Sequence, residues 1–204
     1  MNRSKNLVKL LLVGLIGMFL SLGILNCQRV LAEDEEQERD SGALLRALSQ
    51  SQVSLSDGIK KSTKGAEVPI SAKYELDEKD KLSLSVYTAE KGLNVDPQSN
   101  TFKEISGSPV SATWNPEAEV IKDEDDVKAA KEQLTVLSKA KVSLLDIVEK
   151  AAKENQGTVF AATPEMEDNK SVIEVKVAKD DNVSEHHYDI ASGNEIKMED
   201  DDQY

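Results

Sequence analysis

The sequence contains few of the residues that build catalytic or covalently cross-linked sites. Its only cysteine is Cys27, so the chain cannot form an internal disulfide, and aromatic residues make up only 4%, which predicts modest, aliphatic cores. No serine-hydrolase elbow, phosphate-binding glycine loop or His-Glu-x-x-His motif occurs. We therefore expect a protein that is not an enzyme and that has no catalytic, cofactor-binding or metal-binding residues.

Histidine is equally scarce, with His186 and His187 as the only two. They are adjacent in a predicted strand, and neighbouring side chains on a strand point to opposite faces, so the pair cannot hold one metal ion jointly. His186 shares its parity with Tyr188 and is expected against the core. A structural role is the simpler interpretation of His187; the alternative is weak transition-ion binding together with Glu185 and Asp189.

Basic residues are outnumbered by acidic ones, 25 to 38, which gives a net charge of −13 at pH 7. Such a chain repels nucleic acid and anionic lipid, and it suits cationic partners or divalent ions. The acidic runs at 33–40 and 199–204 are predicted to be a solvated linker and tail. The acidic turns at 77–80 and 180–182 lack the spacing and glycine of an EF-hand loop, so calcium binding there is expected to be loose.

Residues 1–32 are predicted to direct export. Three basic residues precede an uncharged stretch at 10–28, and Val30-Leu31-Ala32 is typical of a signal-peptidase site. Cleavage after Ala32 is one interpretation; an uncleaved anchor and a lipoprotein modified at Cys27 are the others. All three place the remaining chain across the membrane, with membrane contact only through this segment. Cleavage removes four basic and no acidic residues, so the net charge changes from −13 to −17.

Two segments of the exported region resemble each other. Gln-Val-Ser-Leu-Ser-Asp at 52–57 matches Lys-Val-Ser-Leu-Leu-Asp at 141–146 with an offset of 89 residues. Further pairs follow at larger offsets: Leu82, Leu84 and Val86 with Ile173, Val175 and Val177 at 91, and Asp96 with Asp189 at 93. The offset changes only where loops are expected, and loops are where insertions collect. The pattern indicates two copies of one small fold.

Each copy is predicted to contain a capped helix followed by strands. Ser54 and Ser143 are good N-caps, and a further amphipathic helix is expected over 127–137. The face Leu144, Ile147, Val148, Ala151 is more apolar than its counterpart Leu55, Gly58, Ile59, Ser62, so we expect the first copy to be the less stable. The predicted strands are 67–76, 81–88, 93–96 and 101–105 in the first copy and 158–166, 173–177, 183–190 and 195–198 in the second.

This order of elements resembles the PepSY family. The residues that carry the resemblance are Val142–Asp146 through Ala151, the strand 173–177 and the closing stretch Tyr188–Gly193. The first copy departs from the pattern with Ser62 in place of Ala151 and Asn100 in place of Gly193.

The resemblance covers about two-thirds of the exported region. It implies small exported α+β modules that restrain peptidases or bind partners at the cell surface. The resemblance implies no catalytic residues, and it implies that Asp96 and Asp189 form turns.

The expected fold class is α+β, with two tandem small units, each a helix packed on a three- to four-stranded antiparallel sheet. The predicted organisation is a signal peptide or anchor at 1–32, an acidic linker at 33–40, PepSY-like units at 41–107 and 123–198, a linker with Trp114 at 108–122, and a tail at 199–204.

We therefore expect an exported, non-enzymatic binding or regulatory protein that restrains a peptidase or docks on an envelope protein. The alternative is an acidic calcium-binding envelope protein. Nucleic acid is not an expected partner. The composition gives Trp114 two interpretations, a plug between neighbouring units or an exposed anchor for a partner.

Overall fold

The computed structural model describes residues 42–180 and 182–197, which belong to one compact unit. The predicted leader, acidic linker and acidic tail lie outside these residues. Within the described ranges, every helix is too short or too polar to span a bilayer.

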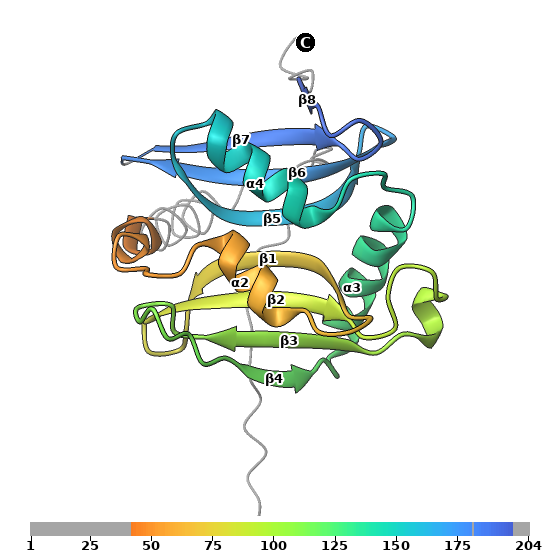
Figure 1. Cartoon of the computed structure of the whole chain (residues 1–204), viewed down its shortest axis with the longest axis horizontal. Coiled ribbons are helices and arrows are strands. Elements are labelled where there is room, and N and C mark those ends of the chain that lie inside the picture. The colour runs from red at the N-terminus through yellow and green to blue at the C-terminus, as the bar shows by residue number, and fades with distance from the viewer. Residues whose placement is uncertain (1–41, 181, 198–204) are drawn as a thin grey trace, which may run out of the picture. The chain divides into compact units, whose positions relative to one another are not determined.

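The eight strands of the described residues join one antiparallel sheet in the order β4-β3-β2-β1-β5-β6-β7-β8 (Figure 1). The strands are β1 Val68–Leu76, β2 Leu82–Ala89, β3 Phe102–Gly107, β4 Glu117–Val120, β5 Thr158–Glu167, β6 Lys170–Lys179, β7 Asn182–Asp189 and β8 Glu195–Ile196. The predicted α+β class with antiparallel strands is confirmed. The two segments do not form separate sheets, because β1 pairs with β5 through Ala72–Ala162 and Lys73–Ala161.

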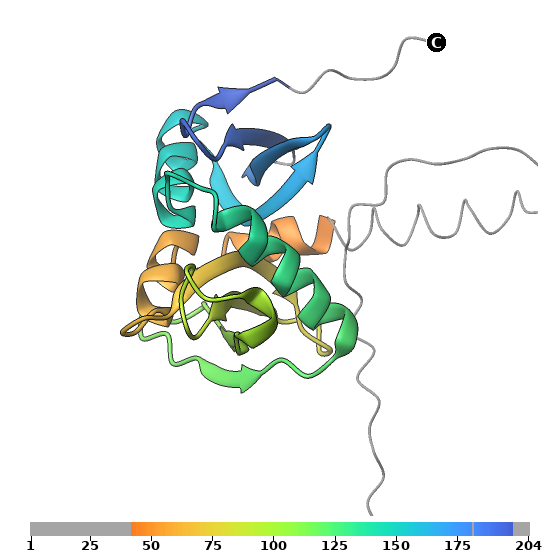
Figure 2. The same ribbon diagram turned by 90° about the vertical axis from the view of Figure 1, so that its right-hand side faces the viewer.

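Two helices cover one face of this sheet. They are α2 Leu55–Ser62 and α4 Leu144–Glu154, and Figure 2 shows both on the same side of the strands. An ion pair between Lys60 Nζ and Glu149 Oε1 at 2.6 Å links them. A third helix, α3 Glu124–Leu137, runs along one end of the strands (Figure 1) and contacts β1, β2 and β5. Residues 42–48 are also helical.

Serine caps fix the starts of α2 and α4. The Ser54 Oγ accepts a hydrogen bond from the Asp57 N–H, and the Ser143 Oγ accepts one from the Asp146 N–H, both at 3.1 Å. The Asp146 carboxylate also accepts from the Ser143 N–H at 3.2 Å, which completes a capping box. Both predicted caps are therefore confirmed.

The core lies between these two helices and the sheet. The buried residues of α4 are Leu144, Ile147, Val148 and Ala151, and those of α2 are Leu55, Gly58, Ile59 and Ser62, as the apolar spacing predicted. Gly58 allows α2 to approach β2 closely, because a Cβ there would lie 2.5 Å from Leu84 Cδ2.

Register shows where the sequence alignment of the two copies was wrong. Ala72 and Ala162 occupy equivalent positions, because each is the second paired residue after the register shift in its strand. Val86 pairs with Ala72 and Val175 pairs with Ala162, so Val86 corresponds to Val175 and not to Val177. Asp96 lies in the loop before β3, where it caps the 3-10 helix η1 Pro97–Ser99, and no strand forms over 93–96. Asp96 therefore has no structural equivalence to Asp189, which ends β7.

The predicted linker contributes to the sheet. It contains the edge strand β4, which pairs with β3. Trp114 is 5% exposed, and its Nε1 donates a hydrogen bond to the Gly107 carbonyl oxygen at 3.1 Å. It therefore fills space within the fold and is not an exposed anchor.

Candidate functional site

The outer face of strands β5, β6 and β7 carries a dense group of charged side chains. On β6, the fully buried Ile173 and Val175 alternate with Glu174 and Lys176, which point to the face opposite the core. Cross-strand pairing sets His187 beside Glu174 and Glu185 beside Lys176. With two glutamates of β5, these residues form what we call the β5–β7 cluster: Glu165, Glu167, Glu174, Lys176, Glu185 and His187.

Two short ion pairs organise the cluster. Lys176 Nζ lies 2.8 Å from Glu185 Oε1 and 3.5 Å from Glu174 Oε1. His187 Nε2 lies 2.9 Å from Glu167 Oε2 and 4.0 Å from Glu174 Oε2. Glu174 lies between the two pairs, because its carboxylate is within 4.0 Å of both Lys176 Nζ and His187 Nε2.

Glu165 completes a compact set of three side chains that could ligate a metal ion. One ligand atom each of Glu165, Glu174 and His187 lies within 4.8 Å of the other two, and all three residues are half-buried. Three strands supply these side chains, so the site depends on sheet register.

Negative charge is in excess at this position. Burial, followed by the charges of Glu174 and Glu167, raises the pKa of Glu165 to about 7. Burial also raises the pKa of Glu174, although Lys176 partly opposes the shift. For Lys176, burial lowers the pKa, but the hydrogen bond to Glu185 and the charge of Glu174 outweigh it, so the net shift is upward. Four carboxyl groups facing one ammonium group favour the uptake of a proton or a cation.

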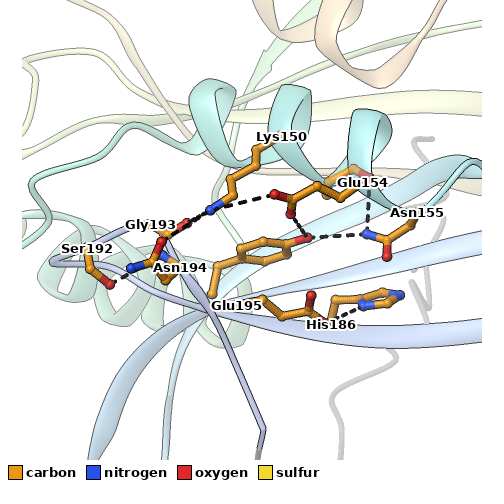
Figure 3. A network of polar contacts seen from close by, with 10 residues as sticks. Lys150, Glu154, Asn155, His186, Ser192, Gly193, Asn194 and Glu195 are labelled. Atoms are coloured by element: carbon orange, nitrogen blue, oxygen red, sulfur yellow. Dashed lines mark hydrogen bonds and ion pairs between the residues drawn. The ribbon is translucent and has the colours of Figure 1, made fainter.

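The structure separates the two histidines as the sequence predicted, but it gives His187 other partners. His186 lies on the opposite face, where its Nε2 is 2.9 Å from Ser184 Oγ. Its Nδ1 is 2.7 Å from Glu195 Oε1 (Figure 3). Of the partners considered for His187, Glu185 pairs with Lys176 and Asp189 is used in a turn. The neighbours of His187 are Glu167 and Glu174. Alternation placed Glu174 on an outer face, but the sequence put Glu167 in a turn, whereas β5 extends to Glu167 and the register brings both glutamates to His187.

Asp189 and Asp96 both accept backbone hydrogen bonds in turns, but at different places in the fold. The Asp189 carboxylate accepts hydrogen bonds from the Ser192 N–H and hydroxyl at 2.7 Å each, and these bonds hold its pKa below the usual range. Gly193 follows with φ +67, a conformation that favours glycine. Asp96 Oδ1 accepts from the Gln98 N–H at 2.9 Å. Neither aspartate belongs to the β5–β7 cluster.

The corresponding face of the first segment has a different chemistry. Ser85 pairs with Lys73 and Ser106, in the same register in which Glu174 pairs with Thr163 and His187. Two serines thus stand where the second segment has Glu174 and His187. The Ser85 hydroxyl lies 2.8 Å from Glu75 Oε1 and 2.9 Å from Glu104 Oε1.

The surface is also hollowed beside α3, away from this cluster. Gln98, Lys128 and Lys131 line that depression, and Lys131 Nζ donates a hydrogen bond to Gln98 Oε1 at 2.7 Å. We assign no chemistry to this depression.

Comparison with protein-family models gave no match, and comparison with curated proteins gave none either. Among solved structures, the chain is similar to a predicted lipoprotein from Clostridium difficile 630, with a TM-score of 0.37 and 18% sequence identity. The match covers 73% of this chain and 93% of that chain. A similarity at this level carries no inference about function, and the PepSY resemblance rests on the sequence motifs alone.

Proposed function

We propose that this chain is an exported, non-catalytic binding protein built from two PepSY-like units, and that it docks on another exported protein. Restraint of a peptidase is the form of docking that the resemblance suggests. Export is inferred from the leader-like residues 1–32.

The observation that carries the proposal is the order of elements. A serine-capped helix followed by three antiparallel strands occurs as α2-β1-β2-β3 and again as α4-β5-β6-β7. The first strand of each set has a register shift near its start, between Pro69 and Ser71 and between Val159 and Ala161. A shared irregularity at the same place supports a duplication, because bulges are retained within families.

The edge strand β4 is the surface best suited to docking by strand addition. All of its residues are exposed, and within the described chain no strand pairs with its outer side. The Ile121 N–H donates to the Phe102 carbonyl of β3. In an antiparallel pair every second residue directs its N–H toward the partner strand, so the N–H groups of Ala118 and Val120 point away from β3. Those groups are available to an extended segment of a partner.

Replacement of Ala118 tests this docking mode. Ala118→Pro removes an outward N–H without removing a bond to β3, whereas Ala118→Val retains that N–H and serves as the control. After cross-linking in the envelope of the native host, we expect wild type and Ala118→Val to retain one abundant exported protein and Ala118→Pro to lose it. Recovery of no protein by wild type, or equal recovery by all three, would count against the proposal.

Calcium binding remains the second candidate because of the net charge of −13. Calcium prefers six to eight oxygen ligands, and the β5–β7 cluster instead combines carboxylates with an imidazole and an ammonium group. The docking proposal predicts no saturable heat of binding on calorimetric titration with calcium. Saturable uptake would favour the calcium-binding alternative.

A further inference from the structure

We infer that Glu165, Glu174 and His187 form a site for a divalent transition-metal ion, for which Zn²⁺ is the most suitable candidate, with Glu167 available as a fourth ligand. This inference goes beyond the docking proposal, because it concerns another surface and does not require a protein partner. It also departs from the expectation, drawn from the sequence, that no metal-binding residues are present.

The ligand atoms converge from three adjacent strands. Glu165 lies on β5, Glu174 on β6 and His187 on β7, and their candidate ligand atoms are within 4.8 Å of one another. Zinc binds imidazole nitrogen and carboxylate oxygen at about 2.0–2.2 Å, which places ligands of a tetrahedral ion about 3.3–3.6 Å apart. The ligand atoms must therefore move closer together by roughly 1 Å, and rotation of the glutamate side chains can provide this movement.

Glu167 lies beside the three proposed ligands. Its buried Oε2 is 2.9 Å from His187 Nε2, with which it forms an ion pair. An ion bound by the His187 imidazole would therefore lie within reach of the Glu167 carboxylate as a fourth ligand.

The charge around the site favours a cation over a purely structural ion-pair network. Lys176 is the only ammonium group of the cluster, and it lies closest to Glu185, at the side away from Glu167. The four carboxyl groups of the cluster outnumber its one ammonium group, and this excess of negative charge favours a cation near His187.

The ligand types select the class of metal. Imidazole with carboxylates suits zinc and neighbouring transition metals, whereas magnesium and calcium favour sites built from oxygen alone. The first segment lacks two of these ligands, because Ser85 and Ser106 occupy the positions that correspond to Glu174 and His187. The site therefore belongs to the second segment only.

Calorimetric titration with zinc chloride tests the site. The full chain, purified in mild detergent and stripped of metal with EDTA, is expected to bind one ion per chain with saturation. His187→Ser, which introduces the residue found in the first segment, should weaken binding by more than about tenfold, and Glu165→Gln should do the same. His186→Ser is the matched control, because it removes the adjacent imidazole on the opposite face, and it should leave the affinity unchanged.

Thermal unfolding separates loss of the site from loss of the fold. Each variant should unfold cooperatively without zinc, and zinc should raise the melting temperature of wild type and of His186→Ser but not of His187→Ser or Glu165→Gln. The inference is overturned if wild type shows no saturable uptake, or if His187→Ser binds as wild type does. Equal losses in His186→Ser and His187→Ser would also overturn it. Because Ala118 takes no part in this site, either proposal can fail while the other stands.

Discussion

Lys150 Nζ donates a hydrogen bond to the Gly193 carbonyl oxygen at 2.6 Å and so ties α4 to the turn that follows β7 (Figure 3). The same ammonium group lies 5.8 Å from the centre of the Tyr188 ring, whose hydroxyl is near Asn155 and Glu154. One side chain thus joins the helix, the closing turn and the last long strand.

Lys150→Met should lower the free energy of unfolding by about 1 kcal/mol. Methionine keeps the aliphatic stem but loses the hydrogen bond and the interaction of the cation with the ring, each of which is modest at a part-buried position. Denaturant unfolding measures the change. Lys153→Met, at an exposed position of the same helix, is the control and should have almost no effect. Equal effects of the two substitutions would contradict a role for Lys150 in fastening the turn.

Ser143→Ala should destabilise the fold by about 1 kcal/mol, because the start of α4 loses the acceptor for the Asp146 N–H. Ser143→Asn should restore most of the loss, since asparagine is an equally good cap. Chemical unfolding of the three proteins in parallel gives the comparison. If the asparagine variant were as unstable as the alanine variant, the capping hydrogen bond would not be the cause.

Local features of this fold could be predicted from the sequence, because they depend on residues a few positions apart. The caps at Ser54 and Ser143 and the buried face of α4 follow from serine chemistry and from a period of 3.6 residues. Alternation likewise placed His186 and His187 on opposite faces. Each of these predictions needed only one element at a time.

Features that depend on register could not be predicted. The pairing of Ala72 with Ala162 joins residues 90 positions apart and merges the strands into one sheet, and no local pattern marks it. The β5–β7 cluster has the same origin, because Glu174 and His187 become neighbours only through the β6–β7 register. The proposed correspondence of Asp96 with Asp189 failed for a related reason: both form turns, but in different loops.

Gly157→Ala should be more damaging than Gly58→Ala. A Cβ at Gly157 would lie 2.7 Å from the Ala178 carbonyl oxygen, which is backbone of a central strand and cannot move without disturbing the sheet. At Gly58 the nearest atom is the end of the Leu84 side chain, and alanine also favours the helix. We expect losses of about 2 kcal/mol or more at Gly157 and about 1 kcal/mol or less at Gly58. Urea unfolding of both variants decides the order, and a larger loss at Gly58 would contradict this packing.

Glu165 should make the stability of the fold depend on pH. The pKa of this carboxyl is raised from 4.5 to about 7 in the folded chain, first by burial and then by Glu174 and Glu167. The folded state therefore holds the proton more tightly than the unfolded state does. The stabilisation from this group is complete below pH 4.5 and is lost as the pH rises through 7.

Glu165→Gln should remove this dependence, because the amide has nearly the same shape and does not ionise. In metal-free buffer at pH 8, the variant should be more stable than wild type by about 1 kcal/mol, a value reduced for solvent screening at a half-buried position. At pH 4 the two proteins should be nearly equal. Glu78→Gln, in an exposed turn, is the control and should shift stability equally at both pH values. A variant less stable than wild type at pH 8 would show that ionised Glu165 is satisfied by its neighbours and that the cluster has no excess of negative charge.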